Sequence, residues 1–155
     1  MARWAAFAAA EPELAAFGED RLGRPPAYLA TVRADGLPRV HPVTPIIGAG
    51  GLYVFMEPTS PKGRDLRERG GFALHSGVLD ADGTGGEFWI AGTAAAVEDP
   101  STRAEVATAA SYSPNDRYVL FELSLHEARC NGYDDVVLPA RTRWAEAASA
   151  GSDSG

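Results

Sequence analysis

The sequence predicts a mainly β domain, built as an antiparallel barrel or sandwich with a few short flanking helices. Apolar runs rich in β-branched and aromatic residues recur along the chain, as at 28–33, 52–56 and 87–97. Asp-Gly and glycine-rich turns separate the first runs, which is typical of a meander of neighbouring antiparallel strands. Apolar residues at helical spacing are confined to short segments.

The N-terminal segment is predicted to form two short helices before the first strand. Apolar residues recur there at spacings of three and seven, the period of one helical face: Trp4, Phe7, Leu14 and Phe17. Pro12 interrupts this pattern and is a residue favoured in the first turn of a helix. The second helix is therefore expected to begin near Glu11.

The first three strands are expected to follow one another directly. A strand over 28–33 ends at the turn Asp35-Gly36. The next segment, 38–47, contains three prolines, which exclude it from the centre of a sheet and predict an edge or bulged strand. The glycine-rich segment 48–51 then turns the chain into a strand over 52–56.

The following segment has the signals of a capped helix, with Ser60 at the N-cap, Pro61 at the first position and Gly70 beyond the end. The remaining elements are predicted in order: strands over 72–75 and 87–97, a helix over 100–110, and strands over 118–125 and 128–133. No linker divides the chain. Residues 1–144 are therefore expected to form one domain and residues 145–155 a flexible tail.

Composition and charge exclude several classes of function. The chain of 155 residues has a formal net charge of −7 and a pI near 4.9, whereas nucleic-acid binding requires a basic surface. No apolar stretch approaches a membrane span, and the single cysteine, Cys130, predicts neither a disulfide nor a cysteine-based metal site. We expect a cytoplasmic protein, and its richness in alanine, glycine and arginine is typical of high-GC bacterial genomes.

The segment from Ser60 to Arg69 is the strongest candidate for an anion site. A helix N-terminus presents unpaired backbone N–H groups and the positive end of its dipole, while Ser60 adds a hydroxyl donor and Lys62 a positive charge. Residues 62–69 contain four basic and two acidic side chains, a local charge of +2 in an acidic protein. A capped helix with a solvated charged face is the alternative.

Three segments carry a resemblance to a known family. The first is 29–43 (LATVRADGLPRVHPV), the second combines 52–55 with Ser60-Pro61-Lys62 and 65–67, and the third is 87–94 (EFWIAGTA). In order and spacing they resemble the opening hairpin, the second landmark and a later strand of the pyridoxamine 5′-phosphate oxidase-like, flavin-binding split barrels. The resemblance extends over about residues 4–144.

This resemblance implies a six-stranded antiparallel split β-barrel and a homodimer with FMN at its subunit interface. It also implies an oxidoreductase that passes hydride or electrons to a small molecule, with Arg39 or a residue of the partner chain stabilising an anionic reduced flavin. The expected cofactor contacts are the phosphate ligands Ser60 and Lys62, the further cation Arg67, the ring-edge contact Glu87, and the ring or ribityl contacts Arg39, Val40, His41, Pro42, Val43, Phe55 and Met56. Trp89 would either cover the ring or face the partner subunit. No catalytic residue is identified.

Departures from the family pattern leave alternatives open. Pro61 stands where the true pyridoxamine-phosphate oxidases have an arginine, and Met56 stands where threonine is common. The C-terminal extension of those oxidases is also lacking, so we do not expect this chain to share their activity. Arg64 or Arg67 would compensate a weakened phosphate site, or the site would take the deazaflavin coenzyme of actinobacterial members. Non-catalytic binding of flavin or haem, and a barrel without cofactor, are further alternatives. The histidines are not spaced as metal ligands.

Overall fold

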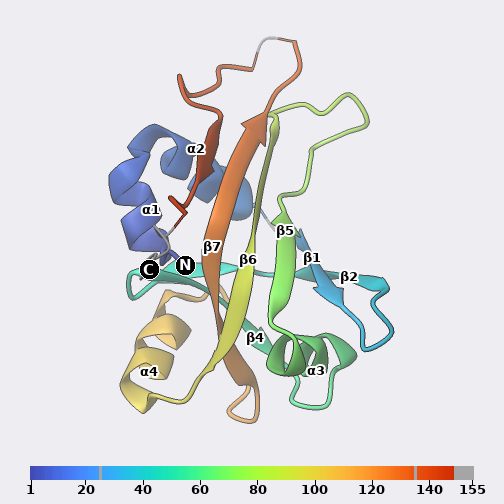
Figure 1. Ribbon diagram of the computed structural model, residues 1–155. Helices are drawn as coiled ribbons and strands as arrows, with labels where there is room; N and C mark the ends of the chain where they lie inside the picture. The colour runs from blue at the N-terminus through green and yellow to red at the C-terminus, as the bar shows by residue number, and fades with distance from the viewer. Residues whose placement is uncertain (25, 135, 149–155) are drawn as a thin grey trace, which may run out of the picture.

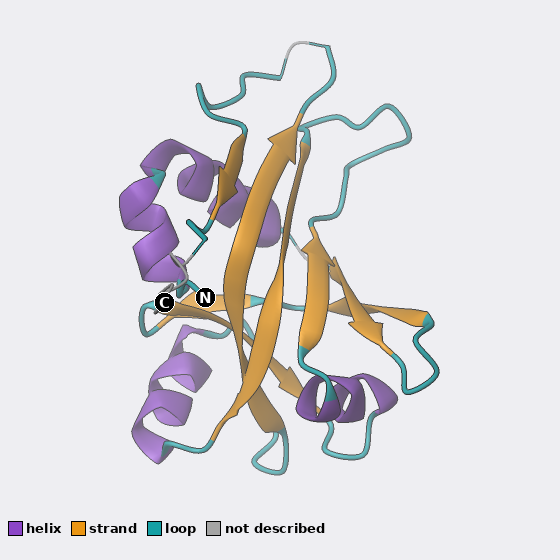
Figure 2. Cartoon of the chain, in the orientation of Figure 1, coloured by secondary structure: helices purple, strands orange, loops and turns teal. Residues whose placement is uncertain are grey.

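The computed structural model describes residues 1–24, 26–134 and 136–148 and confirms a mainly β fold with short helices (Figure 2). The strands are β1 (Ala27–Val32), β2 (Pro38–Val43), β3 (Ile46–Gly48), β4 (Gly51–Met56), β5 (Gly71–His75), β6 (Glu87–Val97), β7 (Val119–Asn131) and β8 (Arg143–Ala145). The helices are α1 (Trp4–Ala10), α2 (Pro12–Leu22), α3 (Pro61–Glu68) and α4 (Pro100–Ala109). None of the described helices is long and apolar enough to span a membrane.

One curled antiparallel sheet contains all the strands, in the order β2-β1-β5-β6-β7-β4-β3, with β8 added to β7. The chain passes from β2 directly into β3 through Thr44 and Pro45, so the two ends of this order are joined covalently. The segment with three prolines was predicted to be an edge or bulged strand, and this is confirmed. β2 lies at one end of the strand order, and the strand is interrupted before β3.

Two expectations about the strands were wrong in detail. The resemblance implied six strands, whereas the described residues form eight, because the break at Thr44 and Pro45 divides one strand and β8 is additional. The segments 118–125 and 128–133 were expected to be separate strands, but they form the single long β7 along β6. Glu146 still donates its backbone N–H to the His126 carbonyl, and residues 149–155 of the expected tail lie outside the described part.

The main core lies between the curled sheet and the N-terminal helices. Helices α1 and α2 cover the β6–β7 part of the sheet, on the left of Figure 1. Trp4 and Phe7 pack edge to face with ring centroids 5.2 Å apart, and Trp4 lies 6.2 Å from Phe88 on β6. A second, smaller cluster lies under α4, around Tyr53 and Val106. Helix α3 closes the end of the sheet near β1 and buries Leu66 in the main core.

A close approach between two strands makes Gly92 a test of this packing. The register of β6 against β7 shifts between Ala91 and Gly92, and a Cβ at Gly92 would lie 1.8 Å from the Ser124 carbonyl oxygen. We expect Gly92→Ala to lower the free energy of unfolding by about 3 kcal/mol, because backbone would have to move. Gly71→Ala is the matched control, since its Cβ would meet only the Val32 side chain at 3.8 Å. Equal urea midpoints for the two variants would contradict the prediction.

Candidate functional site

The N-terminus of α3 is built as the sequence predicts. The Ser60 side-chain oxygen accepts a hydrogen bond from the backbone N–H of Gly63 at 3.2 Å, and Pro61 occupies the first helical position. Gly63 is required there, because a Cβ would lie 2.9 Å from the Ser60 oxygen. The hydroxyl proton of Ser60 and the backbone N–H of Lys62 are not used by the cap. They can donate to an anion placed at this end of the helix.

His41 lies beside this helix start, on the inward side of β2. It is paired across the ladder with Leu29 of β1, which is fully buried, so its ring faces the interior. Its Nε2 atom is buried and has no hydrogen-bond partner among the described residues. Burial lowers the pKa of the His41 ring below its ordinary value, and the positive charges of Lys62 and Arg39 lower it further, against the opposing charge of Asp65. The ring is therefore neutral at pH 7.

An unpaired buried nitrogen is unusual, because leaving such a group without a partner costs about 1–3 kcal/mol. The His41 ring lies close to Lys62, at the helix start for which the sequence predicts an anion site. The nitrogen is enclosed by protein atoms, so its lack of a partner is a cost that the fold carries at this position.

Asp65 joins α3 to the β1–β2 hairpin. The Thr31 hydroxyl and Arg39 Nε donate to Asp65 Oδ2 at 2.8 and 2.9 Å, and Arg69 Nη2 donates to Oδ1 at 3.1 Å. Burial alone would raise the pKa of this carboxyl, but the hydrogen bonds from Arg39, Thr31 and Arg69 outweigh burial and hold the pKa below its usual range. Arg69 Nε also donates to the Val32 carbonyl at 2.7 Å, which fixes the far end of the helix.

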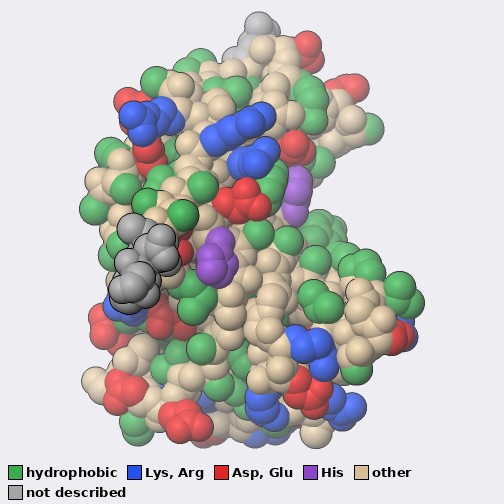
Figure 3. Space-filling model, in the orientation of Figure 1, with side chains coloured by type: hydrophobic (Ala, Val, Ile, Leu, Met, Phe, Trp, Pro, Cys, Tyr) green, Lys and Arg blue, Asp and Glu red, His purple; other side chains and the backbone are tan. Residues whose placement is uncertain are grey.

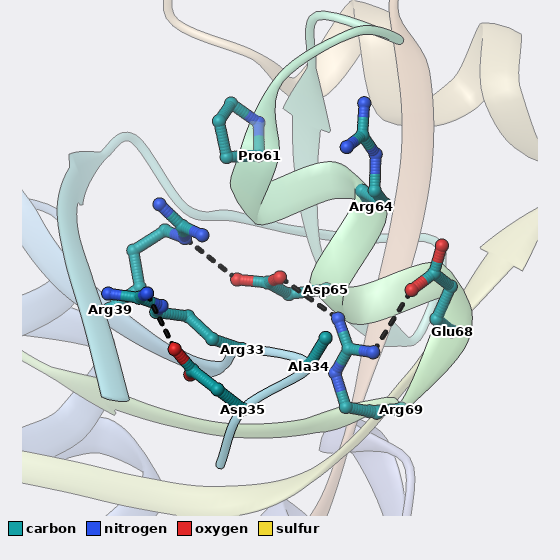
Figure 4. A pocket seen from close by; sticks show the side chains of 9 residues that line it. All are labelled: Arg33, Ala34, Asp35, Arg39, Pro61, Arg64, Asp65, Glu68 and Arg69. Atoms are coloured by element: carbon teal, nitrogen blue, oxygen red, sulfur yellow. Dashed lines mark hydrogen bonds and ion pairs between the residues drawn. The ribbon is translucent and has the colours of Figure 1, made fainter. Parts of the chain in front are cut away.

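A cavity of 280 Å³ opens beside this ion-pair network (Figure 4). Its walls are formed by nine residues: Arg33, Ala34, Asp35, Arg39, Pro61, Arg64, Asp65, Glu68 and Arg69. Most of its cations are already paired, since Arg33 contacts Asp35 at 2.7 Å and Arg69 contacts Glu68 at 3.0 Å. Figure 4 shows Arg64 directed away from these pairs. The cavity therefore offers an anion little positive charge that is not already compensated.

The outward side of the sheet carries a separate apolar hollow of 380 Å³, in the indented right-hand side of the molecule in Figure 3. Its walls are Tyr28, Ala30, Val40, Ala73, Leu74, His75 and Trp89. Val40 is 61% exposed and Tyr28 45%, which is high for large apolar side chains. A second hollow of 470 Å³ continues along the same strands and shares Ala30 and Ala73. This outward face is therefore a continuous apolar surface over β1, β2, β5 and β6.

Polar groups occupy one margin of the outward face. His75 Nε2 lies 3.5 Å from Glu87 Oε2, and His75 Nδ1 is hydrogen bonded to the Ser76 carbonyl. Trp89 is paired across the sheet with His75 on β5 and with Arg129 on β7. The Arg129 guanidinium lies 5.3 Å from the centroid of the Trp89 ring. Glu87 and Trp89 therefore belong to this surface.

The structure divides the expected contacts of β2 and α3 between two sides of the sheet. Arg39, His41 and Val43 face inward, whereas Val40 and Pro42 face outward. Of the three inward residues, His41 lies close to Lys62. Arg67 lies in the last turn of α3, about 10 Å along the helix from Ser60.

The two expected contacts on β4 also face opposite ways. Met56 is buried in the main core, and its Cβ lies 3.9 Å from the position that a Cβ at Gly63 would occupy. Phe55 faces α4, with the Arg103 guanidinium 5.0 Å from its ring centroid. Only Met56 therefore adjoins the start of α3.

Asp65 and Thr31 belong to the site, although no sequence pattern assigned them to it. They are 34 residues apart, and no local pattern indicates a contact of that range. The only signal was the i,i+4 spacing of Asp65 and Arg69, which is also typical of an ordinary exposed helical pair.

A family model described as pyridoxamine 5′-phosphate oxidase matches residues 10–131. No curated protein matches the chain. Three solved structures are similar at TM-scores of 0.63, 0.54 and 0.61: a haem-binding protein from Mycobacterium smegmatis, the haem storage protein HutZ from Vibrio cholerae, and a candidate pyridoxamine 5′-phosphate oxidase from Listeria innocua.

Sequence identity to these three structures is 19%, 19% and 18%, so the similarity shows the fold alone. The matches cover 84%, 74% and 78% of this chain. They cover 57%, 89% and 97% of the other chains, so this chain spans little more than half of the mycobacterial protein.

Replacing Asp65 by Asn tests its role in joining the helix to the hairpin. We expect Asp65→Asn to lower the free energy of unfolding by about 2 kcal/mol at pH 7, because two arginines lose a charged partner. The pKa of Asp65 is depressed in the folded state, so this advantage of the wild type is full above about pH 5 and declines as the pH falls below about 4.

Glu68→Gln is the control for Asp65→Asn. Glu68 also contacts Arg69, but its side chain is half exposed, and we expect a change of no more than about 0.5 kcal/mol. Urea titrations at pH 7 and pH 3.5 measure both variants. A difference between wild type and Asp65→Asn that stays constant over this range would contradict the assignment.

Proposed function

The chain belongs to the pyridoxamine 5′-phosphate oxidase family, and from that membership we propose that it is a homodimeric oxidoreductase that binds FMN. The observation that carries the proposal is the meeting of Ser60, Lys62 and His41 where α3 begins beside β2. The FMN phosphate would bind at the start of α3. The acceptor or donor of its hydride or electrons would be a small organic molecule.

The residues at this place fit a phosphate. Lys62 is the only lysine of the chain, is half buried, and forms no ion pair with a carboxylate in the described residues. Ser60 and the Lys62 backbone retain free donors at the positive end of the helix dipole. Pro61 contributes no N–H group, so the site has fewer donors than one with arginine at that position. We therefore assign most of the phosphate affinity to Lys62.

When bound, the flavin ring supplies the hydride or electron transfer, and the protein supplies position and charge. Asp65 already compensates much of the charge of Arg39, so Arg39 would contribute little to stabilising an anionic reduced ring. Its role in the proposal is to hold β2 against α3. Lys62 and Arg64, in the first turn of α3, form no ion pair with a carboxylate in the described residues.

The proposed dimer rests on the outward face. Val40, Tyr28 and Trp89 would lose their contact with water if a second copy covered this apolar surface. Glu87 and Trp89, which the resemblance assigns to the cofactor site, lie on this surface and not beside Lys62. In a symmetric dimer these residues would reach the cofactor held by the other copy.

Non-catalytic haem binding is the second candidate function. His75 lies on the wall of the apolar outward hollow, and an imidazole at the edge of an apolar cavity is a common arrangement for a haem ligand. Two of the similar structures are described as haem-binding and haem-storage proteins. The deazaflavin coenzyme is the alternative for the flavin site itself.

Spectra of the purified protein test FMN binding. After incubation with FMN and gel filtration, we expect the flavin bands to be retained, and we expect Lys62→Ala to weaken binding about tenfold or more, because a charged hydrogen bond to phosphate is lost. Arg67→Ala removes the same charge from the other end of α3 and is expected to change affinity less than twofold.

The other possible outcomes of this experiment would assign the site differently. A Soret band with added haem and no flavin retention would favour the second candidate. Retention of the deazaflavin coenzyme alone would change the cofactor and keep the fold of the site. Equal losses for Lys62→Ala and Arg67→Ala would contradict a local phosphate site at the helix start.

A charge placed on the outward face tests the dimer. We expect the wild type to elute as a dimer and Ala73→Arg to elute as a monomer, because Ala73 lies exposed between the two apolar hollows. Ala95→Arg is the matched control, since Ala95 is an exposed strand alanine that lines neither hollow. Light scattering after gel filtration gives the masses, and a monomeric wild type would refute the proposed assembly.

A further inference from the structure

Two arginines lie directly opposite each other at the β7–β8 margin of the outward face. Arg129 on β7 is paired across the sheet with Arg143 on β8, and on its other side with Trp89 on β6. The side chains of such a pair lie on the same face, with Cβ atoms about 4.5–5.5 Å apart, and like charges there destabilise the sheet. Figure 3 shows basic side chains side by side on the upper part of this face.

The nearby carboxylates compensate these two charges only in part. Glu127 Oε2 lies 3.4 Å from Arg129 Nη2, and the two side chains are 35% and 40% exposed, so water screens the contact. Glu87, a second carboxylate on this face, contacts His75 instead. Arg143 is exposed and forms no ion pair with a carboxylate in the described residues. A positive charge therefore remains here, in a chain whose net charge is −7.

The arginine pair begins where the apolar hollow ends. Trp89 is part of the wall of the hollow, and the Arg129 guanidinium lies 5.3 Å from the centroid of the Trp89 ring. One register row across the sheet contains Tyr28, His75, Trp89, Arg129 and Arg143 in that order. Neighbouring strands are about 4.8 Å apart, so β7 and β8 lie about 5 and 10 Å from β6. A small molecule can therefore contact the apolar wall and the cations together.

We infer that Arg129 and Arg143 bind the anionic group of the substrate, and that the substrate is a flat aromatic acid. The inference rests on the proposed function, because it assumes that the flavin ring held by the other copy reaches Trp89. The aromatic body of the substrate would lie beside that ring, and its carboxylate would accept hydrogen bonds from the guanidinium groups. A guanidinium matches the two oxygens of a carboxylate, and the negative charge would offset the repulsion between the arginines.

The position of the pair leaves it available to a second anion besides the FMN phosphate. In the proposed function the phosphate binds at the start of α3, on the inward side of β2, whereas the arginines lie on the outward face. A second copy that covers the hollow over β1, β2 and β5 would have β7 and β8 at its margin, open to solvent. A neutral substrate would leave both cations uncompensated, so this site would select acids over amides.

The test compares 2-naphthoate with its uncharged counterpart 2-naphthamide on the FMN-loaded protein. Binding is followed through the flavin absorption bands, which change when an aromatic molecule lies against the ring. We expect the wild type to bind the acid about tenfold more tightly than the amide, because charged hydrogen bonds are gained. This preference should decline at high salt, since exposed charges are screened.

Variants of the arginines assign the preference to this pair. Arg143→Gln should lower the affinity for 2-naphthoate about tenfold, and change those for 2-naphthamide and FMN less than twofold. Arg143→Lys keeps the charge without the planar fork and should bind the acid within about threefold of the wild type. Arg141→Gln is the matched control, because it removes an exposed arginine that contacts Glu11 at 2.8 Å and should leave all three affinities unchanged.

A stability measurement makes a merely structural role visible. The melting temperature of ligand-free Arg143→Gln should equal or exceed that of the wild type, because a contact between like charges has been removed. A lower melting temperature together with equal losses for the acid and the amide would mean that Arg143 only supports the fold, and would overturn the inference.

The remaining outcomes separate this inference from the proposed function. A wild type that retains no FMN overturns both. FMN retention with equal affinities for the acid and the amide, or with equal losses in Arg141→Gln and Arg143→Gln, overturns the inference and leaves the proposed function standing. A loss of FMN affinity in Arg143→Gln also overturns it, because the pair would then hold the FMN phosphate. Binding of 2-naphthoate without a change in the flavin bands overturns it as well, because the acid would then lie away from the cofactor.

Discussion

The buried carboxylate of Asp65 is the contact on which the geometry of the candidate site depends. Its side chain is only 4% exposed, and a charge so far from water is stable only when it is paired. Its partners come from β1, β2 and the end of α3, so a single carboxylate sets the angle between the helix and the hairpin. The start of α3, with Ser60 and Lys62, is held beside β2 as a consequence.

The alternation of side chains along β2 gives the molecule two different surfaces from one short strand. Arg39 and His41 face inward, where burial and charge control hydrogen bonding, and Val40 and Pro42 face outward onto an apolar surface. The break at Thr44 and Pro45 frees β2 from pairing with β4, because the chain pairs there through β3 instead. The proposed cofactor contacts lie on both sides of β2. The proposal therefore requires a second copy on the outward side of the strand.

Local features of the fold could be read from the sequence because they depend on neighbouring residues. The cap at Ser60 and Pro61, the joint between α1 and α2 at Glu11, and the edge position of β2 follow from proline and glycine geometry. The continuity of β7 could not be predicted in this way, since pairing with β6 and not local propensity keeps residues 126–127 extended. The family resemblance supplied the barrel topology that residue patterns left open.

The candidate site was harder to predict than the fold, because its electrostatics depend on which charges meet in space. The sequence assigns a local charge of +2 to residues 62–69, but Arg69 is paired with both Asp65 and Glu68. Arg67 lies at the opposite end of the helix from Ser60.

What remains at the helix start is Lys62 next to a neutral histidine, with Arg64 directed away from the ion pairs of the cavity. A site with so few uncompensated cations binds a phosphate less strongly than an arginine cluster would. It must then take more of its affinity and specificity from neutral hydrogen bonds to the rest of the ligand.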